Sequence, residues 1–141
     1  MKVEGGEGVK RNDAYTVGEQ NGKYKTNLRK RLFVFAAEVV RLIMSLPYRK
    51  EYDVFRYQLS KSSTSIGANY EESQAGSRAE FRQKINICLR EARETSYWLR
   101  LIKELDIFKK EASLETLDNL IREADEIQKI FGSISLKVKD R

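Results

Sequence analysis

Histidine is missing from this sequence of 141 residues, and there is a single cysteine, Cys88. Without histidine, the chain has neither the commonest metal ligand nor the usual general base of nucleophilic catalysis. One cysteine cannot close a disulfide within the chain, which fits a reducing compartment. These absences predict a cytoplasmic protein that is not an enzyme.

The other motifs that carry chemistry are missing as well. The sequence has no glycine-rich phosphate loop, no paired-cysteine spacing and no dinucleotide fingerprint. Glu71 and Glu72 are adjacent, so on a helix they point about 100° apart and cannot serve one site as acid and base. Cys88 falls in an apolar stripe, where we expect a buried hydrophobic side chain rather than a reactive thiol. We therefore expect no catalytic residue, no metal and no cofactor.

Long hydrophobic runs are also missing. The longest uninterrupted apolar run, Leu32–Ala37, is far shorter than the roughly 20 residues of a membrane-spanning helix. Residues 1–26 hold five of the eight glycines and show no apolar periodicity, so we interpret them as a flexible N-terminal tail with no export signal. We expect one domain at residues 27–138, a short tail at 139–141 and no membrane partner.

The rest of the chain shows apolar residues at spacings of three and four, which is the pattern of amphipathic helices. The first such segment runs from Leu28 to Leu46 and ends near Pro47. The second begins between residues 51 and 54 and reaches Gly76, which we expect to form a left-handed C-terminal cap.

The last two helices carry start signals. Ser77 and Glu80 form a Ser-x-x-Glu capping box before the third apolar stripe. Ser113 is expected to cap the fourth helix, after a break near residues 109–110. Four helices joined by short loops pack antiparallel, so the expected fold class is all-α, an antiparallel up-down four-helix bundle.

Two of these helices have an unusual composition. Residues 62–68 of the second are mostly small, and Gly67 costs a helix about 1 kcal/mol relative to Ala, so we expect a neighbouring helix to approach closely there. In the first helix, apolar side chains cover roughly 220° of the circumference, more than one bundle face buries. We infer that this surplus joins copies into a homo-oligomer, the alternative being a deeply buried first helix.

Positive charge gathers in one stretch. Residues 27–50 hold six basic residues against Glu38 alone, a net charge of +5 out of +6 for the whole chain. The six, here called the basic patch, are Arg29, Lys30, Arg31, Arg41, Arg49 and Lys50. Such a patch predicts a salt-dependent, sequence-tolerant affinity for RNA or DNA backbones, and a solvated face without a partner is the alternative. Tyr48, Tyr52 and Tyr57 near the same loop either stack on bases or pack with an exposed hydroxyl.

The segment Gln58–Gln74, QLSKSSTSIGANYEESQ, closely resembles the second helix of the bacterial four-helix-bundle proteins encoded within intervening sequences of 23S ribosomal RNA genes. The family's pattern is matched by Gln58, Ser65, Ile66, Asn69 and Glu71, and together with Gly67 these residues form the expected helix-packing motif. Phe81 and residues 87–99 look like the family's third helix, so the resemblance covers roughly residues 27–130.

This family is similar in fold to the accessory variability protein of diversity-generating retroelements, a pentameric barrel that binds nucleic acid and its reverse transcriptase. The resemblance therefore implies a homo-pentameric barrel and supplies no catalytic residue. Our leading hypothesis is a non-catalytic oligomer that associates with nucleic acid through the basic patch, within a ribonucleoprotein. The alternative is a protein-binding scaffold or adaptor, for example for a reverse transcriptase.

Overall fold

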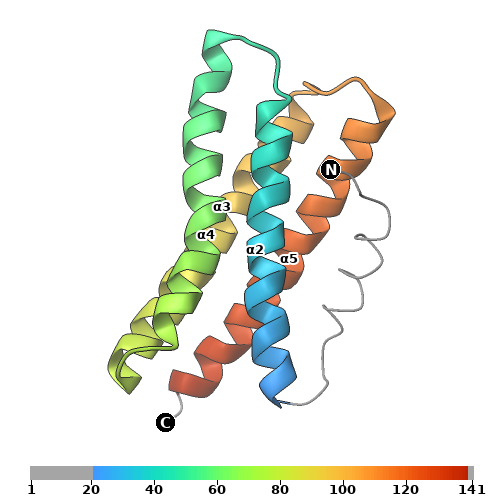
Figure 1. Ribbon diagram of the computed structural model, residues 1–141. Coiled ribbons are helices and arrows are strands. Elements are labelled where there is room, and N and C mark those ends of the chain that lie inside the picture. Colours follow the sequence, from blue (N-terminus) through green and yellow to red (C-terminus); the bar gives the residue numbers. More distant parts are fainter. Residues whose placement is uncertain (1–20, 140–141) are drawn as a thin grey trace.

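The computed structural model describes residues 21–139, with side chains from residue 27 onward. Its helices are α2 (Asn21–Met44), α3 (Asp53–Ser73), α4 (Arg78–Glu104) and α5 (Glu111–Lys139), with a one-turn 3-10 helix, η1 (Lys50–Tyr52), before α3. Each helix packs against its neighbours in the chain, and α2 also contacts α5, so that the four helices form a closed antiparallel arrangement (Figure 1). The described residues contain no strand. The expected all-α four-helix bundle is confirmed.

The helix boundaries differ from the expected ones at both ends of the bundle. Helix α2 begins at Asn21, so residues 21–26, which we had assigned to the tail, are helical. Helix α5 extends to Lys139, the first residue of the expected tail at 139–141. The remaining tail residues, 1–20 and 140–141, lie outside the described residues. Helix α5 begins at Glu111, which places Ser113 inside its first turn, so the prediction that Ser113 caps this helix was wrong.

The turn between α3 and α4 confirms one expectation and corrects another. The Ser77 hydroxyl accepts a hydrogen bond from the Glu80 N–H at 3.2 Å, and the Glu80 carboxylate accepts one from the Ser77 N–H at 2.7 Å, which completes the capping box. Helix α3 already ends at Ser73, and Gly76 does not adopt a left-handed φ, so the predicted glycine cap was wrong. A Cβ atom on Gly76 would instead collide with the Glu80 side chain that closes the capping box.

The core is one apolar cluster to which all four long helices contribute. In α4, the third apolar stripe of the sequence runs from Ile85 to Ile102 and is buried, and Phe81 before it is half-buried. The apolar stripe of α5 is buried at some positions and half-buried at others. The buried residues are Leu117, Leu120, Ala124, Ile127 and Phe131, and the half-buried ones are Leu114, Ile121 and Ile134. None of the helices in the described part of the chain is long and apolar enough to cross a membrane.

Two helices approach the small residues in the middle of α3 from different sides. On the α4 side, the Thr95 hydroxyl oxygen lies 2.9 Å from that of Ser62, and the Cys88 thiol donates to the Ile66 carbonyl at 3.4 Å. On the α2 side, a Cβ atom on Gly67 would lie 3.4 Å from the Leu32 Cβ. The expected close helix contact is confirmed, and the buried hydroxyl groups within it have hydrogen-bond partners.

Substitutions at Gly67 should distinguish a close contact from an overcrowded one. Gly67→Ala should raise the melting temperature, because Ala is favoured over Gly by about 1 kcal/mol in a helix and its Cβ would stand at contact distance from Leu32. Gly67→Leu should lower the free energy of unfolding by about 1 to 3 kcal/mol, because Leu32 atoms already lie within 3.8 Å of that Cβ position. Thermal unfolding followed by circular dichroism measures both effects. A Leu variant that melts with the parent would contradict the close contact.

Candidate nucleic-acid interface

The structure divides the basic patch into two exposed groups, one in the first half of α2 and one at its end and in the following loop, and turns Arg31 toward the bundle. Arg29 and Lys30 are exposed in the first half of α2, whereas Arg41 is exposed near its end. Lys30 and Arg41 stand eleven positions apart, which is about 16 Å along a helix axis. Arg49 and Lys50 follow in the loop and in η1, both exposed. The sequence cluster is therefore an elongated track with two ends and not a compact patch.

Arg31 is turned toward the bundle. Its Nε atom lies 2.5 Å from Glu123 Oε2 on α5 and its Nη2 atom 2.8 Å from Oε1, a bidentate ion pair. The side chain of Arg31 is only 12% exposed and that of Glu123 28%. This pair joins α2 to α5, so the Arg31 guanidinium belongs to the fold and we leave it out of the proposed interface.

The loop between α2 and α3 is held by Arg56, a residue that the sequence analysis missed. Arg56 donates to the carbonyl oxygen of Pro47 at 2.7 Å and to that of Leu46 at 3.3 Å, and Asp53 accepts from it at 3.1 Å. Its guanidinium also lies over the Tyr48 ring, 5.3 Å from the centroid. The signal that could have revealed it is the spacing of three residues from Asp53, which pairs the two on one helix face.

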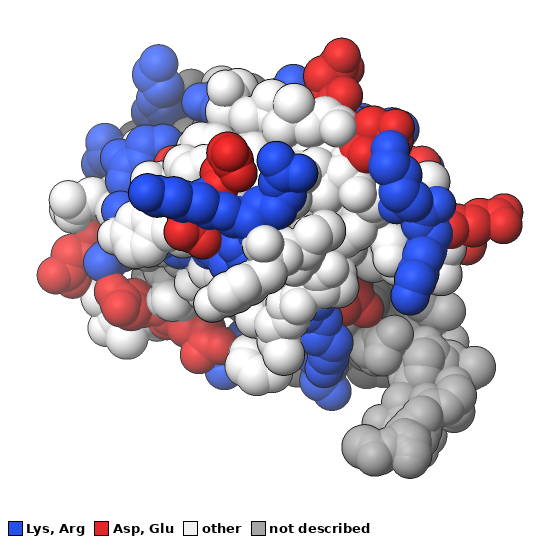
Figure 2. All heavy atoms as spheres, turned by 90° about the horizontal axis from the view of Figure 1, so that it is seen from above, with Lys and Arg blue, Asp and Glu red and all other residues white. Residues whose placement is uncertain are grey.

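A second cation lies over an aromatic ring in the same loop. Arg49 stands 5.7 Å from the centroid of the Tyr52 ring and 3.6 Å from the Glu51 carboxylate, in an exposed ion pair that contributes little stability. Figure 2, which views the molecule from the end that carries this loop, shows Lys and Arg side chains spread over that end with acidic side chains among them. This end is mixed in sign, so local contacts decide which cations are free.

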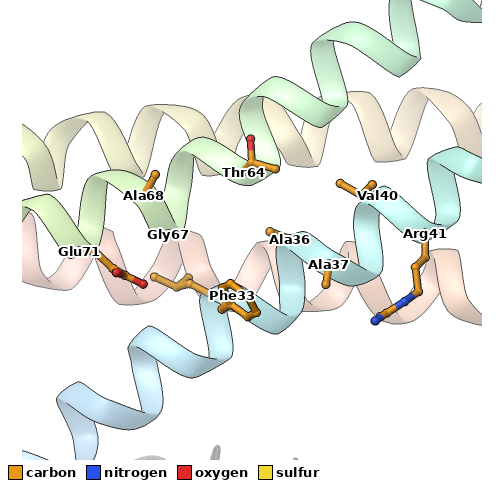
Figure 3. A pocket seen from close by; sticks show the side chains of 10 residues that line it. Phe33, Ala36, Ala37, Val40, Arg41, Thr64, Gly67, Ala68 and Glu71 are labelled. Carbon is orange, nitrogen blue, oxygen red and sulfur yellow. The ribbon is translucent and has the colours of Figure 1, made fainter. Parts of the chain in front are cut away.

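A groove runs between α2 and α3, and we call it the α2 groove (Figure 3). Its volume is about 600 Å³. The lining side chains are Leu32, Phe33, Ala36, Ala37, Val40 and Arg41 from α2 and Thr64, Gly67, Ala68 and Glu71 from α3. Phe33 in this lining is 69% exposed, and Met44 farther along α2 is 78% exposed. The first helix therefore carries an apolar face that its own bundle does not cover.

The helix-packing motif divides between the core and this groove. Ile66 is buried and Gly67 lies against α2, as a packing role requires. Asn69 donates to the Ser65 carbonyl at 2.8 Å within its own helix, so its amide group has a hydrogen-bond partner. Gln58 is half-buried, and Glu71 is exposed at the edge of the α2 groove.

The titratable groups that drew attention in the sequence do not converge. Glu71 lines the α2 groove, whereas Glu72 pairs with Lys84 at 2.8 Å. Burial raises the pKa of the Cys88 thiol to about 12. Burial, followed by the negative charge of Glu94, raises the pKa of Glu91, which lines neither the α2 groove nor a second hollow between α2 and α5. Among the described residues, no group of three or more acidic or cysteine side chains could hold a metal ion.

This architecture is that of a small antiparallel four-helix-bundle protein. Residues 25–133 match the family described as 23S rRNA-intervening sequence protein, and the chain belongs to that family. The crystal structure of a protein with unknown function from the S23 ribosomal protein family of Bacteroides thetaiotaomicron is similar, with 36% sequence identity and a TM-score of 0.66. The match covers 76% of this chain and 96% of that one. The curated proteins include no match to the chain.

The structural role of Arg31 can be separated from a binding role. Arg31→Gln removes a charged partner from the part-buried Glu123 carboxylate and should lower the free energy of unfolding by about 1 to 3 kcal/mol. Denaturant unfolding measures this loss. Well below the melting temperature, the folded variant should bind nucleic acid as the parent does. Unchanged stability with weakened binding would instead return Arg31 to the interface.

Proposed function

We propose that this protein is a non-catalytic homo-oligomer that associates with nucleic acid backbones through α2 and the loop that follows it, within a ribonucleoprotein. The observation that carries the proposal is a set of four exposed cations for which the described part of the chain supplies no ion-pair partner. They are Arg29, Lys30, Arg41 and Lys50. An unpaired surface cation can neutralise a phosphate without first losing an internal partner, and each such contact releases condensed counterion.

The track of cations suits a backbone better than a single phosphate group. Lys30 and Arg41 are separated by about 16 Å along α2, the length of several phosphate spacings on a nucleic acid strand. Contacts to phosphate groups do not read the bases, so the affinity should tolerate changes of nucleic acid sequence. Repetition of the track in an oligomer would multiply the contacts and with them the salt dependence.

The same helix supports the oligomeric part of the proposal. Phe33 lines the α2 groove and is itself exposed, and Met44 protrudes from α2 outside the groove. A protruding residue and a hollow on one chain allow copies to associate head to tail, and such contacts close into a ring when the rotation permits. The resemblance described above implies a ring of five members.

The alternative is a protein-binding scaffold, and the α2 groove is the observation that favours it. A groove of this size, lined mainly by apolar and small side chains, can accept the apolar face of a helix from another protein. Under that alternative, the cations of α2 steer the partner and do not bind phosphate.

Oligomer formation can be tested by light scattering at micromolar concentration. The parent should have a mass that is a whole multiple, greater than one, of the 16.4 kDa of a single chain. Phe33→Glu should lower the measured mass, because a carboxylate in an apolar interface is costly to desolvate. Leu136→Glu is the matched control, since Leu136 is also an exposed apolar residue but lies on α5. A parent that stays a monomer would contradict the proposal, and a ring of another size would remove only the fivefold inference.

Nucleic-acid binding can be tested with a double charge reversal. Lys30→Glu with Arg41→Glu should lower the affinity for RNA and DNA, and should flatten the dependence of log affinity on log salt by up to about 0.9 per lost phosphate contact on duplex DNA. The control is Arg82→Glu with Arg93→Glu on α4, which are exposed and have the same spacing. Fluorescence anisotropy over a salt series measures both.

The two double variants decide between the functions. The control reverses the same amount of charge, so it should change the affinity and the salt slope less than the α2 variant does. If both variants fold, assemble and bind equally, the α2 track is a solvated face and the scaffold alternative becomes the better one. Circular dichroism establishes folding, which both variants should retain because glutamate is a good helix former. Light scattering establishes assembly, which both variants should also retain.

A further inference from the structure

Tyr48 lies in the loop between α2 and α3 and is 98% exposed. The neighbouring tyrosine, Tyr52, is half-buried and packs against the Phe55 ring at 5.9 Å between centroids, so ordinary packing accounts for it. Packing does not account for Tyr48, whose ring contributes almost nothing to the core. An aromatic side chain of this size loses favourable burial when it stays in water, so its presentation by a fixed loop needs another explanation.

The loop that presents Tyr48 is fixed by hydrogen bonds and not merely short. Arg56 donates to the carbonyl oxygens of Leu46 and Pro47 at 3.3 and 2.7 Å, and the Asp53 carboxylate accepts from the same guanidinium at 3.1 Å. Pro47 restricts the backbone immediately before the tyrosine. The guanidinium lies over one side of the ring, 5.3 Å from its centroid, and the ring stays open to solvent.

We propose that Tyr48 is a stacking platform for an unpaired nucleobase, with Lys50 beside it to neutralise a flanking phosphate. Every base offers a π-face, so stacking on tyrosine tolerates any sequence, and a guanidinium on the opposite side of the ring adds a cation–π contact. Lys50 is exposed two positions along the chain and has no ion-pair partner among the described residues. This inference rests on the proposed function and narrows its ligand to strands with unpaired bases.

The chemistry is shared by single-stranded RNA, single-stranded DNA and the loops of folded RNA. In a duplex the bases are already stacked on one another, so a tyrosine on the protein surface cannot reach their faces without unpairing them. The protein should therefore bind an unpaired strand more tightly than a duplex of the same length. The contacts that the protein makes with phosphate groups should form with unpaired strands and with duplexes alike.

The test compares Tyr48→Ala and Tyr48→Phe with the parent on an oligouridine, an oligothymidine and a matched duplex. Tyr48→Ala should weaken binding to both single strands about tenfold, a typical loss for one stacked base, and leave duplex affinity and the salt slope unchanged. Tyr48→Phe should bind as the parent does. A fluorescent adenine analogue in the strand should be quenched by the parent and by Tyr48→Phe, but not by Tyr48→Ala.

Tyr57→Ala is the matched control, because Tyr57 is an exposed tyrosine over whose ring the described residues place no cation. It should bind as the parent does. If Tyr48→Ala binds single strands normally while the α2 charge reversal weakens binding, the stacking inference fails and the proposed function stands. If the parent binds none of the three probes, both fail. If Tyr48→Ala instead changes the mass measured by light scattering, Tyr48 belongs to a protein interface and the inference is overturned.

Discussion

The close approach of α2 and α4 to the middle of α3 is the contact on which the rest of the bundle depends. Large side chains in that segment would separate the helices, and the fully buried residues on either side, such as Leu32 and Thr95, would lose their contacts. Small polar residues are tolerated there only because each hydroxyl finds a partner, since an unsatisfied buried group costs about 1 to 3 kcal/mol. Ser62 meets this requirement through Thr95 and through a carbonyl of its own helix.

The same small residues also shape the outer surface. Thr64 and Ala68 stand on the solvent side of the α3 segment and cannot fill the space beside α2, so a groove remains where larger residues would have closed the surface. Helix α2 lies along this groove with an apolar outer face that includes Phe33. The sequence segment that brings the helices together in one chain thus leaves the surface through which we propose that copies associate.

Periodicity was sufficient to predict the four helices, their order and most of the core, because a buried stripe must recur once per turn in any packed helix. The capping box was predictable as well, since Ser77 and Glu80 satisfy each other locally. The boundaries at Ser113 and Gly76 were not, because several residues near a helix end can cap it and tertiary contacts select among them. Residues 21–26 had too few apolar side chains to reveal a helix by periodicity.

The candidate interface was predictable as a count of charges but not as an arrangement. Net charge along a sequence does not show which cations are already paired, and Arg31 is held by Glu123, a residue 92 positions away that no local pattern connects to it. The opposite error occurred at Arg56, which lies outside the basic stretch and yet positions the loop on which Tyr48 stands. The ion pair with Glu123 makes the Arg31 cation unavailable at the surface, whereas the hydrogen bonds of Arg56 fix a loop that holds the Tyr48 ring there. We therefore add to the proposed interface the loop that follows α2, where exposed Lys50 and the exposed Tyr48 ring lie two positions apart.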